Sequence, residues 1–169
     1  MCKKLTNFYS SPGVSRNPCS DEYPGERAFS EPETRSWSEL VTDVNHRRPI
    51  AAYFTLHSYG QMWMYPYGYT DTLPVNHEEL DRLSRVGVAA IAEVNGEPYE
   101  TGTISKVIYK TSGDSIDWVH DQLNVSVAFA IELRDRRHGS KFGILLPPEF
   151  IEPTATELWA GLRAVLNEL

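Results

Sequence analysis

The sequence predicts a single α/β domain, and three patterns support that prediction. Residues 50–56 form an apolar run interrupted only by Thr55, which is typical of a strand buried on both faces of a parallel sheet. Residues 125–132 alternate at period two, as a strand with two unlike faces does. Apolar residues at helical spacing lie before, between and after these segments. A chain of 169 residues is long enough to bury one core of this kind.

The first part of the chain is expected to be irregular and then helical. Residues 1–29 are rich in turn formers and show little periodicity. In the segment 30–33, Ser30 and Glu33 fit a capping box and Pro32 suits a first helical turn. The apolar stripe of this helix would consist of Trp37, Leu40, Val41 and Val44.

The later elements follow from the same signals. A helix is expected from about Asn76 to Asn95-Gly96, and residues 97–115 are expected to form a long functional loop. A short helix over 115–122 and a last helix from about Pro153 complete the chain. The two long helices would bury stripes of apolar residues, namely Leu80, Leu83, Gly87, Ala90, Ile91 and Val94 in one, and Leu158, Leu162, Val165, Leu166 and Leu169 in the other.

The two predicted strands end in polar side chains. The apolar run 50–56 stops at His57, and ligands bind outside the carboxyl ends of strands in open α/β sheets. In the second strand, Glu132 ends a face of small residues, so a bulky group or a cavity should lie over it. That face consists of Ser126, Ala128, Ala130 and Glu132, and the opposite face of Val125, Val127, Phe129 and Ile131.

Composition and charge exclude several classes of partner. The chain is 41% hydrophobic and 23% charged, with a net charge of −7 and no basic block, which argues against nucleic acid. No apolar run approaches the roughly 20 residues of a membrane helix, so no membrane partner is expected. Residues 1–7 lack the apolar stretch of a secretory signal. Cys2 and Cys19 allow one disulfide or none.

His57 and Glu132 together suggest metal-assisted chemistry. A neutral imidazole is a common zinc ligand, and a carboxylate beside a metal-bound water is a common general base. Taken alone the pair is a weak signal, because ordinary hydrogen bonds and solvation satisfy most residues of these types at strand ends.

Several longer motifs, in the correct order, resemble the zinc metallocarboxypeptidases of the pancreatic A/B type. They are Asn17-Pro18-Cys19-Ser20, His57-Ser58-Tyr59-Gly60-Gln61, the segment from Tyr65 to Thr70, the segment from Ile108 to Trp118, Ile131-Glu132-Leu133-Arg134-Asp135, Leu145-Leu146-Pro147, and the segment from Ile151 to Ala155. The resemblance covers residues 13–169 and leaves 1–12 as a divergent N-terminal segment. It implies the C-terminal half of a catalytic domain. The expected fold is therefore part of a mixed, mostly parallel twisted sheet flanked by helices, with the N-terminal half missing.

The resemblance also implies the roles of individual residues. His57 would be the third zinc ligand, and Ser58 and Tyr59 would line substrate subsites. Tyr109 would close over the C-terminal carboxylate of a peptide or protein substrate. Glu132 would act as the general base that activates the zinc-bound water to attack the scissile carbonyl. The protein would accordingly be a secreted hydrolase.

The same resemblance implies a substrate preference. Ile116 stands where the family selects the C-terminal side chain, and an isoleucine there implies an apolar or aromatic residue. Ile108, Gly113 and Ala130 would line the same pocket. The resemblance further implies cis peptide bonds that do not precede proline, at Ser58-Tyr59, Pro66-Tyr67 and Arg134-Asp135.

The sequence departs from the family in its ligand set. None of the five histidines is followed three residues later by Glu, so the His-x-x-Glu motif of the other two zinc ligands is absent from these residues. The Asn-Arg pair that grips the substrate carboxylate is also absent. Its position corresponds to Cys2-Lys3, and a lysine lacks the bidentate fork of arginine. Cys19 corresponds to a family cysteine whose partner lies upstream. The basic segment 136–141 is expected to be a solvated insertion.

These departures leave three hypotheses open. Because a tetrahedral zinc site needs three protein ligands and a water, the chain alone should bind zinc weakly and hydrolyse peptides very slowly, if at all. It could be part of a zinc carboxypeptidase, with the missing N-terminal half as its partner. It could instead be an inactive truncated form or pseudoenzyme that binds peptides or proteins, or a fragment that does not fold alone.

Overall fold

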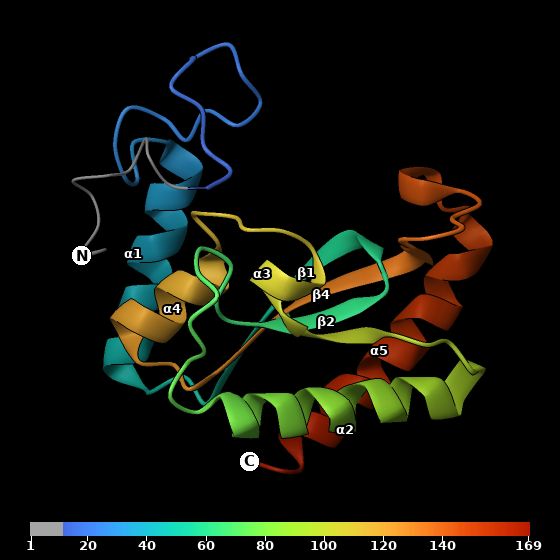
Figure 1. Cartoon of the computed structure of the whole chain (residues 1–169). Helices are drawn as coiled ribbons and strands as arrows, with labels where there is room; N and C mark the ends of the chain where they lie inside the picture. The colour runs from blue at the N-terminus through green and yellow to red at the C-terminus, as the bar shows by residue number, and fades with distance from the viewer. Residues whose placement is uncertain (1–11) are drawn as a thin grey trace.

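The computed structural model describes residues 12–169 as one mixed sheet packed between helices (Figure 1). The four strands are β1 (Ala52–Gly60), β2 (Met62–Tyr65), β3 (Glu100–Thr103) and β4 (Val127–Arg136), in the order β1-β4-β2-β3. β1 pairs with β4 and β2 pairs with β3 in parallel, whereas β2 and β4 are antiparallel. The predicted mixed, mostly parallel sheet flanked by helices is confirmed.

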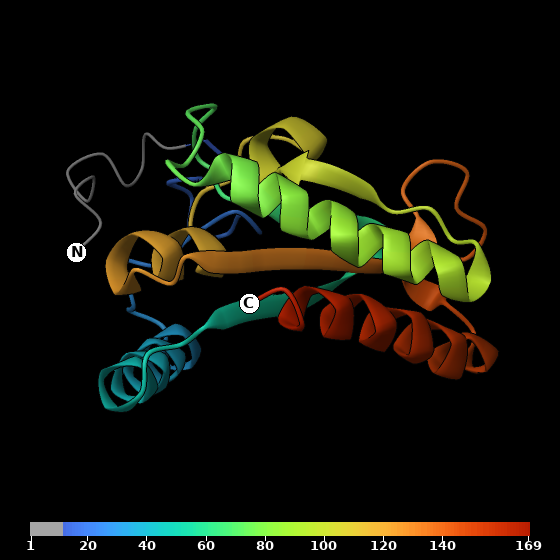
Figure 2. The ribbon, with the colours of Figure 1, turned by 90° about the horizontal axis from the view of Figure 1, so that it is seen from below.

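Helices cover both faces of the sheet. They are α1 (Pro32–Arg47), α2 (His77–Asn95), α3 (Ile104–Val107), α4 (Ser115–Leu123) and α5 (Ile151–Leu166), with 3-10 turns η2 (Gly143–Leu145) and η3 (Pro148–Phe150) before α5. α2 and α5 lie side by side over one face (Figure 2). In the part of the chain that the structure describes, no helix is both long and apolar enough to cross a membrane.

The alternation of β4 divides the core into two clusters. Phe129 and Ile131 point toward α2 and α5, where they join Trp63 of β2. On the other face, Ala128 and Ala130 join a second core cluster that contains residues of α3 and α4. The predicted alternation holds from Val127 onward. Val125 was expected on the first face but packs in the second cluster, because it precedes the strand and does not follow its pleat.

The prediction that residues 50–56 form a strand buried on both faces is wrong. β1 is the edge strand of the sheet and has β4 as its one neighbour among the described residues. Leu56 is consequently 49% exposed, whereas its register partner Ile131 is fully buried. β1 also continues past His57 to Gly60, so the polar residues lie within the strand.

Several local predictions also need correction. The expected loop 97–115 contains β3 and α3. α1 has no capping box, because its N-cap residue is Glu31 and the Ser30 hydroxyl donates to the Glu31 carboxylate (2.8 Å). Five residues of the predicted stripes are largely exposed, namely Leu40, Val44, Val94, Leu166 and Leu169.

Other local predictions are confirmed. α2 ends at Gly96, which takes the left-handed conformation (φ 70°) expected of a C-cap glycine. α4 begins at Ser115 as expected. The segment 12–31 contains no helix or strand, in keeping with its turn-rich sequence.

Candidate functional site

His57 and Glu132 lie next to each other near the carboxyl ends of β1 and β4. Their Cα atoms are register partners in the parallel ladder, so their side chains leave the same face of the sheet. His57 Nε2 lies 2.9 Å from Thr55 Oγ1, the preceding residue on that face. An imidazole and a carboxylate that the sequence separates by 75 positions are therefore brought together, as predicted.

The Glu132 carboxylate is suited to accept a proton. It is partly buried, and burial raises its pKa, while the neighbouring His57 acts in the opposite direction. Glu132 Oε2 is buried and has no hydrogen-bond partner among the described residues. A carboxylate with a raised pKa and an unused acceptor can serve as a general base for a small molecule beside it.

Asp114 is an acidic residue within electrostatic reach of His57 that the sequence interpretation did not include. It is the N-cap residue of α4, but its side chain accepts a hydrogen bond from Thr111 Oγ1 and does not cap the helix. Burial raises its pKa, and His57 is among the groups that lower it. Only the spacing of Thr111 and Asp114 hinted at this contact in the sequence.

A second buried carboxylate fixes the backbone that follows β2. Asp117 accepts hydrogen bonds from the backbone N–H groups of Gly68 (2.9 Å) and Tyr69 (3.3 Å). Burial and the charge of Asp114 raise the pKa of Asp117 to about 7. The Tyr67 hydroxyl donates to Asp121 (2.7 Å), so α4 holds this loop through two acidic side chains.

The residues assigned to the substrate by resemblance fall into two groups. Ile116 and Ala130 are buried in the second core cluster, with Ile108 packed against it. Tyr109 is 65% exposed, and Gly113 (φ 93°) has no atom within 4 Å of the place of a Cβ.

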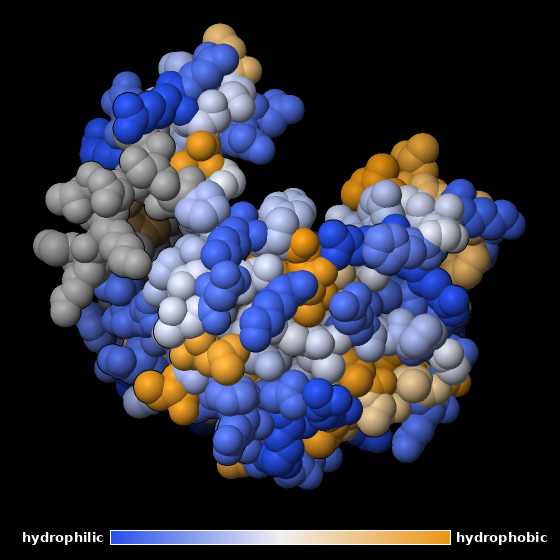
Figure 3. All heavy atoms as spheres, viewed as in Figure 1, coloured by the Kyte–Doolittle hydropathy of each residue, from blue (hydrophilic) through white to orange (hydrophobic). Residues whose placement is uncertain are grey.

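The substrate residues on β1 face solvent. Ser58 and Tyr59 are exposed, and a Cβ on Gly143 would lie 3.2 Å from the Tyr59 ring, so η2 borders this tyrosine. The three cis peptide bonds expected from the resemblance are present, at Ser58-Tyr59, Pro66-Tyr67 and Arg134-Asp135. The described molecule is hollowed between two raised lobes, formed by the segment before α1 and the segment between β4 and α5 (Figure 3).

Beyond Glu132, the end of β4 is tied down by charged contacts. Arg134 forms an ion pair with Glu157, whose side chain is fully buried. Asp135 accepts hydrogen bonds from the backbone N–H groups of Lys141 (2.7 Å) and Phe142 (2.8 Å). These bonds lower the pKa of Asp135 to about 2.

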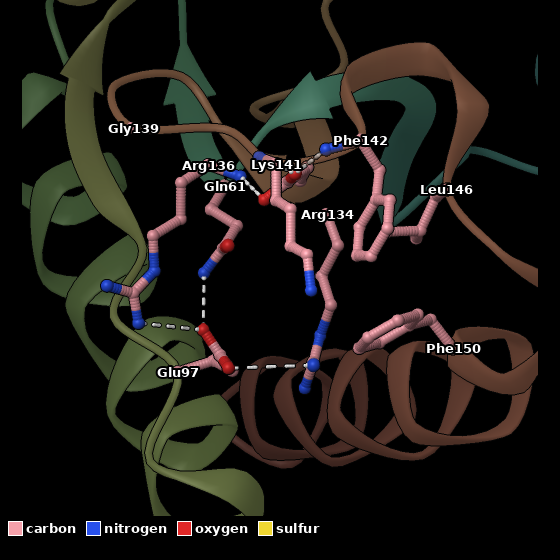
Figure 4. A pocket seen from close by; sticks show the side chains of 10 residues that line it. Gln61, Glu97, Arg134, Arg136, Gly139, Lys141, Phe142, Leu146 and Phe150 are labelled. Carbon is pink, nitrogen blue, oxygen red and sulfur yellow. Dashed lines mark hydrogen bonds and ion pairs between the residues drawn. The ribbon is translucent and has the colours of Figure 1, made fainter.

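A cavity of about 290 Å³ opens beside Arg134 (Figure 4). Glu97 lines one side of it and pairs with Arg136 (3.1 Å) and Arg134 (3.5 Å), while Phe142 and Phe150 line another side. Three of the charged side chains that line the cavity, Glu97, Arg134 and Arg136, therefore form ion pairs that belong to the fold.

The basic segment 136–141 is not a purely solvated insertion. Arg137 donates hydrogen bonds to the backbone carbonyls of Val107 and Ile108, directly before Tyr109. Its own N–H donates to the Gly60 carbonyl (3.2 Å), so it links β1, β4 and the Tyr109 segment. The sequence indicated the charge of this segment but not the backbone that it would bind.

The donors described here do not by themselves fit a zinc ion. Within residues 12–169 there is no group of three or more His, Cys, Asp or Glu residues that could hold a metal. His57 offers one imidazole, whereas zinc sites with catalytic water use three protein ligands. Cys2 and Lys3, which correspond to the missing Asn-Arg pair, lie outside the described residues, and Cys19 is an exposed free thiol.

The chain is similar in sequence to known carboxypeptidases. The chain is 40% identical to rat carboxypeptidase A2 over 161 residues (95% of this chain, 37% of that protein), and 40% identical to carboxypeptidase B of the crayfish Astacus astacus over 155 residues (92% and 50%). It therefore spans half or less of the length of these relatives.

Solved structures and the family description point the same way. Bovine thrombin-activatable fibrinolysis inhibitor, solved with tick carboxypeptidase inhibitor, superposes with a TM-score of 0.86 at 32% identity, over 93% of this chain and 51% of that one. Carboxypeptidase A of Helicoverpa armigera gives 0.82 at 32% identity, over 92% and 38%. Residues 6–161 match the family described as zinc carboxypeptidase, and the chain belongs to that family.

Proposed function

We propose that this chain supplies one half of the active site of a carboxypeptidase, which hydrolyses the last peptide bond of peptides and proteins. The observation that carries the proposal is the pairing of His57 with Glu132 across β1 and β4, in a chain of the zinc carboxypeptidase family. The buried apolar residues Ile116 and Ala130 favour substrates with an apolar or aromatic C-terminal side chain.

Two residues of this chain would act on the substrate directly. Glu132 would take a proton from the water that attacks the scissile carbonyl, and its raised pKa and free Oε2 suit this role. Tyr109 would close over the substrate's C-terminal carboxylate, for which its exposed position leaves it free. Ser58 and Tyr59 would contact the residues that precede the scissile bond. Bound zinc supplies Lewis-acid chemistry in such sites, and among residues 12–169 we propose His57 as the single residue that would help to hold it.

The partner we propose is a polypeptide that carries the remaining part of the catalytic domain. In the described part of the chain, one edge of β1 has no paired strand and Leu56 beside it is exposed, so a further polypeptide could pair with this edge and cover Leu56. Such a partner would also bring the ligands that His57 lacks. By kinship with the pancreatic enzymes, we place this activity outside the cell.

A complementation experiment tests the proposal. The full chain is mixed with zinc and with the N-terminal part of rat carboxypeptidase A2 that it does not match, and release of phenylalanine from a blocked Gly-Phe dipeptide is measured. We expect cleavage with one zinc per complex, and loss of about 100-fold or more in rate for Glu132→Gln. Glu149→Gln, at an exposed position, is the control and should keep full activity. A stable complex that holds zinc and does not cleave would overturn the proposal.

The second candidate is a peptide-binding or protein-binding module without catalysis. It is favoured by the lone imidazole and by the absence of an Asn-Arg pair from the sequence. It predicts a folded chain that contains no zinc by elemental analysis. Stoichiometric zinc together with cleavage of a C-terminal phenylalanine would rule it out.

A further inference from the structure

The side chain of Asp114 lies beside the residues assigned to the substrate's C-terminal side chain. It stands between Gly113 and Ile116 in the chain, at the start of α4. A Cβ added to Gly68 would overlap with Asp114 Oδ2 and Thr111 Oγ1, so the carboxylate occupies the space that glycine leaves free. The charge of His57 lowers the pKa of Asp114, against the larger effect of burial, so the carboxylate lies within electrostatic reach of His57.

Within residues 12–169, the Asp114 carboxylate forms no ion pair. Among the ion pairs of the described residues, the nearby Lys110 pairs with Asp71 (2.5 Å), and none involves Asp114. The Thr111 hydroxyl donates a hydrogen bond to the Asp114 carboxylate. The Asp117 carboxylate accepts hydrogen bonds from two backbone N–H groups, and the charge of Asp114 raises its pKa. The charged form of a partly buried carboxylate is stabilised when a ligand brings a positive charge next to it.

We propose that Asp114 is a specificity-determining residue, which makes the site proposed for the substrate's C-terminal side chain accept Lys or Arg. The aliphatic part of such a side chain would contact Ile116 and Ala130, and its positive end would pair with the Asp114 carboxylate. Lysine and arginine combine an apolar stem with a positively charged end, which match the two apolar residues and the carboxylate, respectively. The inference rests on the proposed function and extends its apolar preference, which considered Ile116 alone.

Binding of three peptides to the full chain tests this role without any need for catalysis. The probes are N-acetyl-Gly-Lys, N-acetyl-Gly-norleucine, which has a four-carbon stem without the ammonium group, and N-acetyl-Gly-Phe. Affinities are measured at pH 8 by NMR titration, followed at the amides of Gly68 and Ile116. We expect the Lys peptide to bind about tenfold more tightly than the norleucine peptide, the scale of one charged hydrogen bond.

Two variants separate the role of Asp114 from the general negative charge of α4. Asp114→Asn keeps an acceptor for the Thr111 hydroxyl and should abolish the preference for Lys while leaving the norleucine and Phe affinities unchanged. Asp121→Asn, at an exposed position on the same helix, should keep the preference. Equal binding of Lys and norleucine, or a preference that survives in Asp114→Asn, would overturn the inference alone. Failure of all three peptides to bind would also overturn the inference, whereas the proposed function is overturned only by the complementation experiment, in which the complex holds zinc and does not cleave.

Discussion

The carboxyl ends of β1 and β4 lie side by side, yet they are held very differently. β4 has a strand on each side, and its last residues, Arg134 and Asp135, are bound by α5 and by the following loop. Among residues 12–169, β1 has β4 as its one neighbouring strand, and Leu56 and His57 are exposed. The chain thus satisfies the groups at one end of its site and leaves the other end open, as expected if a second polypeptide completes it.

Two carboxylates on β4 show the same contrast. Asp135 accepts several backbone N–H bonds, which lower its pKa to about 2. Glu132, three residues earlier, is partly buried with Oε2 unbonded, and burial raises its pKa. A carboxylate bonded on all sides stabilises a loop, whereas one with a raised pKa and a free acceptor is available to a substrate.

The largest effect on stability should come from the buried ion pair at the end of β4. In Glu157→Gln, Arg134 would lose its fully buried partner and keep the longer ion pair with Glu97 (3.5 Å). The Tyr99 hydroxyl and the Asn95 amide would lose a charged acceptor. We expect the free energy of unfolding, measured by urea denaturation, to fall by about 3 kcal/mol or more. Glu168→Gln removes an exposed ion pair with Arg82 and should change it little. Equal effects would show that the buried pair contributes no more than a surface pair.

A matched pair of substitutions, one on β4 and one on β1, should give the next largest effect on stability. Ile131 and Leu56 are register partners on adjacent strands, but Ile131 is fully buried and Leu56 is half exposed. Ile131→Ala should lower the free energy of unfolding by about 2–5 kcal/mol, because it leaves a cavity in the core. Leu56→Ala should cost less than about 1 kcal/mol in the chain alone. If a partner covers β1, the cost of Leu56→Ala should rise in the complex, and an unchanged cost would contradict that partner surface.

The difference between these two residues also marks what the sequence could predict. The alternation of residues 127–132 follows from the pleat of one strand, so their two faces were predictable. The edge position of β1 depends on which strands lie beside it, and an apolar run such as 50–56 carries no information on that. Asp114 is a similar case, because its placement depends on the missing side chain of Gly68, which lies 46 positions earlier in the sequence.

Acid should loosen the end of β4 through Asp135. Because its pKa is lowered to about 2 from an unfolded value of about 4, its stabilising contribution is complete above pH 4 and is lost as the pH falls toward 2. We expect the amides of Lys141 and Phe142 to become less protected over this range, measured by native-state hydrogen exchange. Asp135→Asn should show the same loss of protection at pH 7. Protection that stays the same in this variant would contradict the role of the carboxylate.

The smallest effect on stability should come from Arg137, which connects the carboxyl ends of β1 and β4. Its guanidinium binds the carbonyls of Val107 and Ile108, so it restrains the backbone directly before the exposed Tyr109. In Arg137→Ala we expect faster hydrogen exchange and broader NMR signals at Ile108 and Tyr109, with the denaturation midpoint nearly unchanged. Arg137→Lys retains the charge but not the planar fork, and should be intermediate because one ammonium reaches two carbonyls poorly. A variant in which Tyr109 is as ordered as before would show that α3 alone restrains this segment, and that the inserted loop has no part in closing the site.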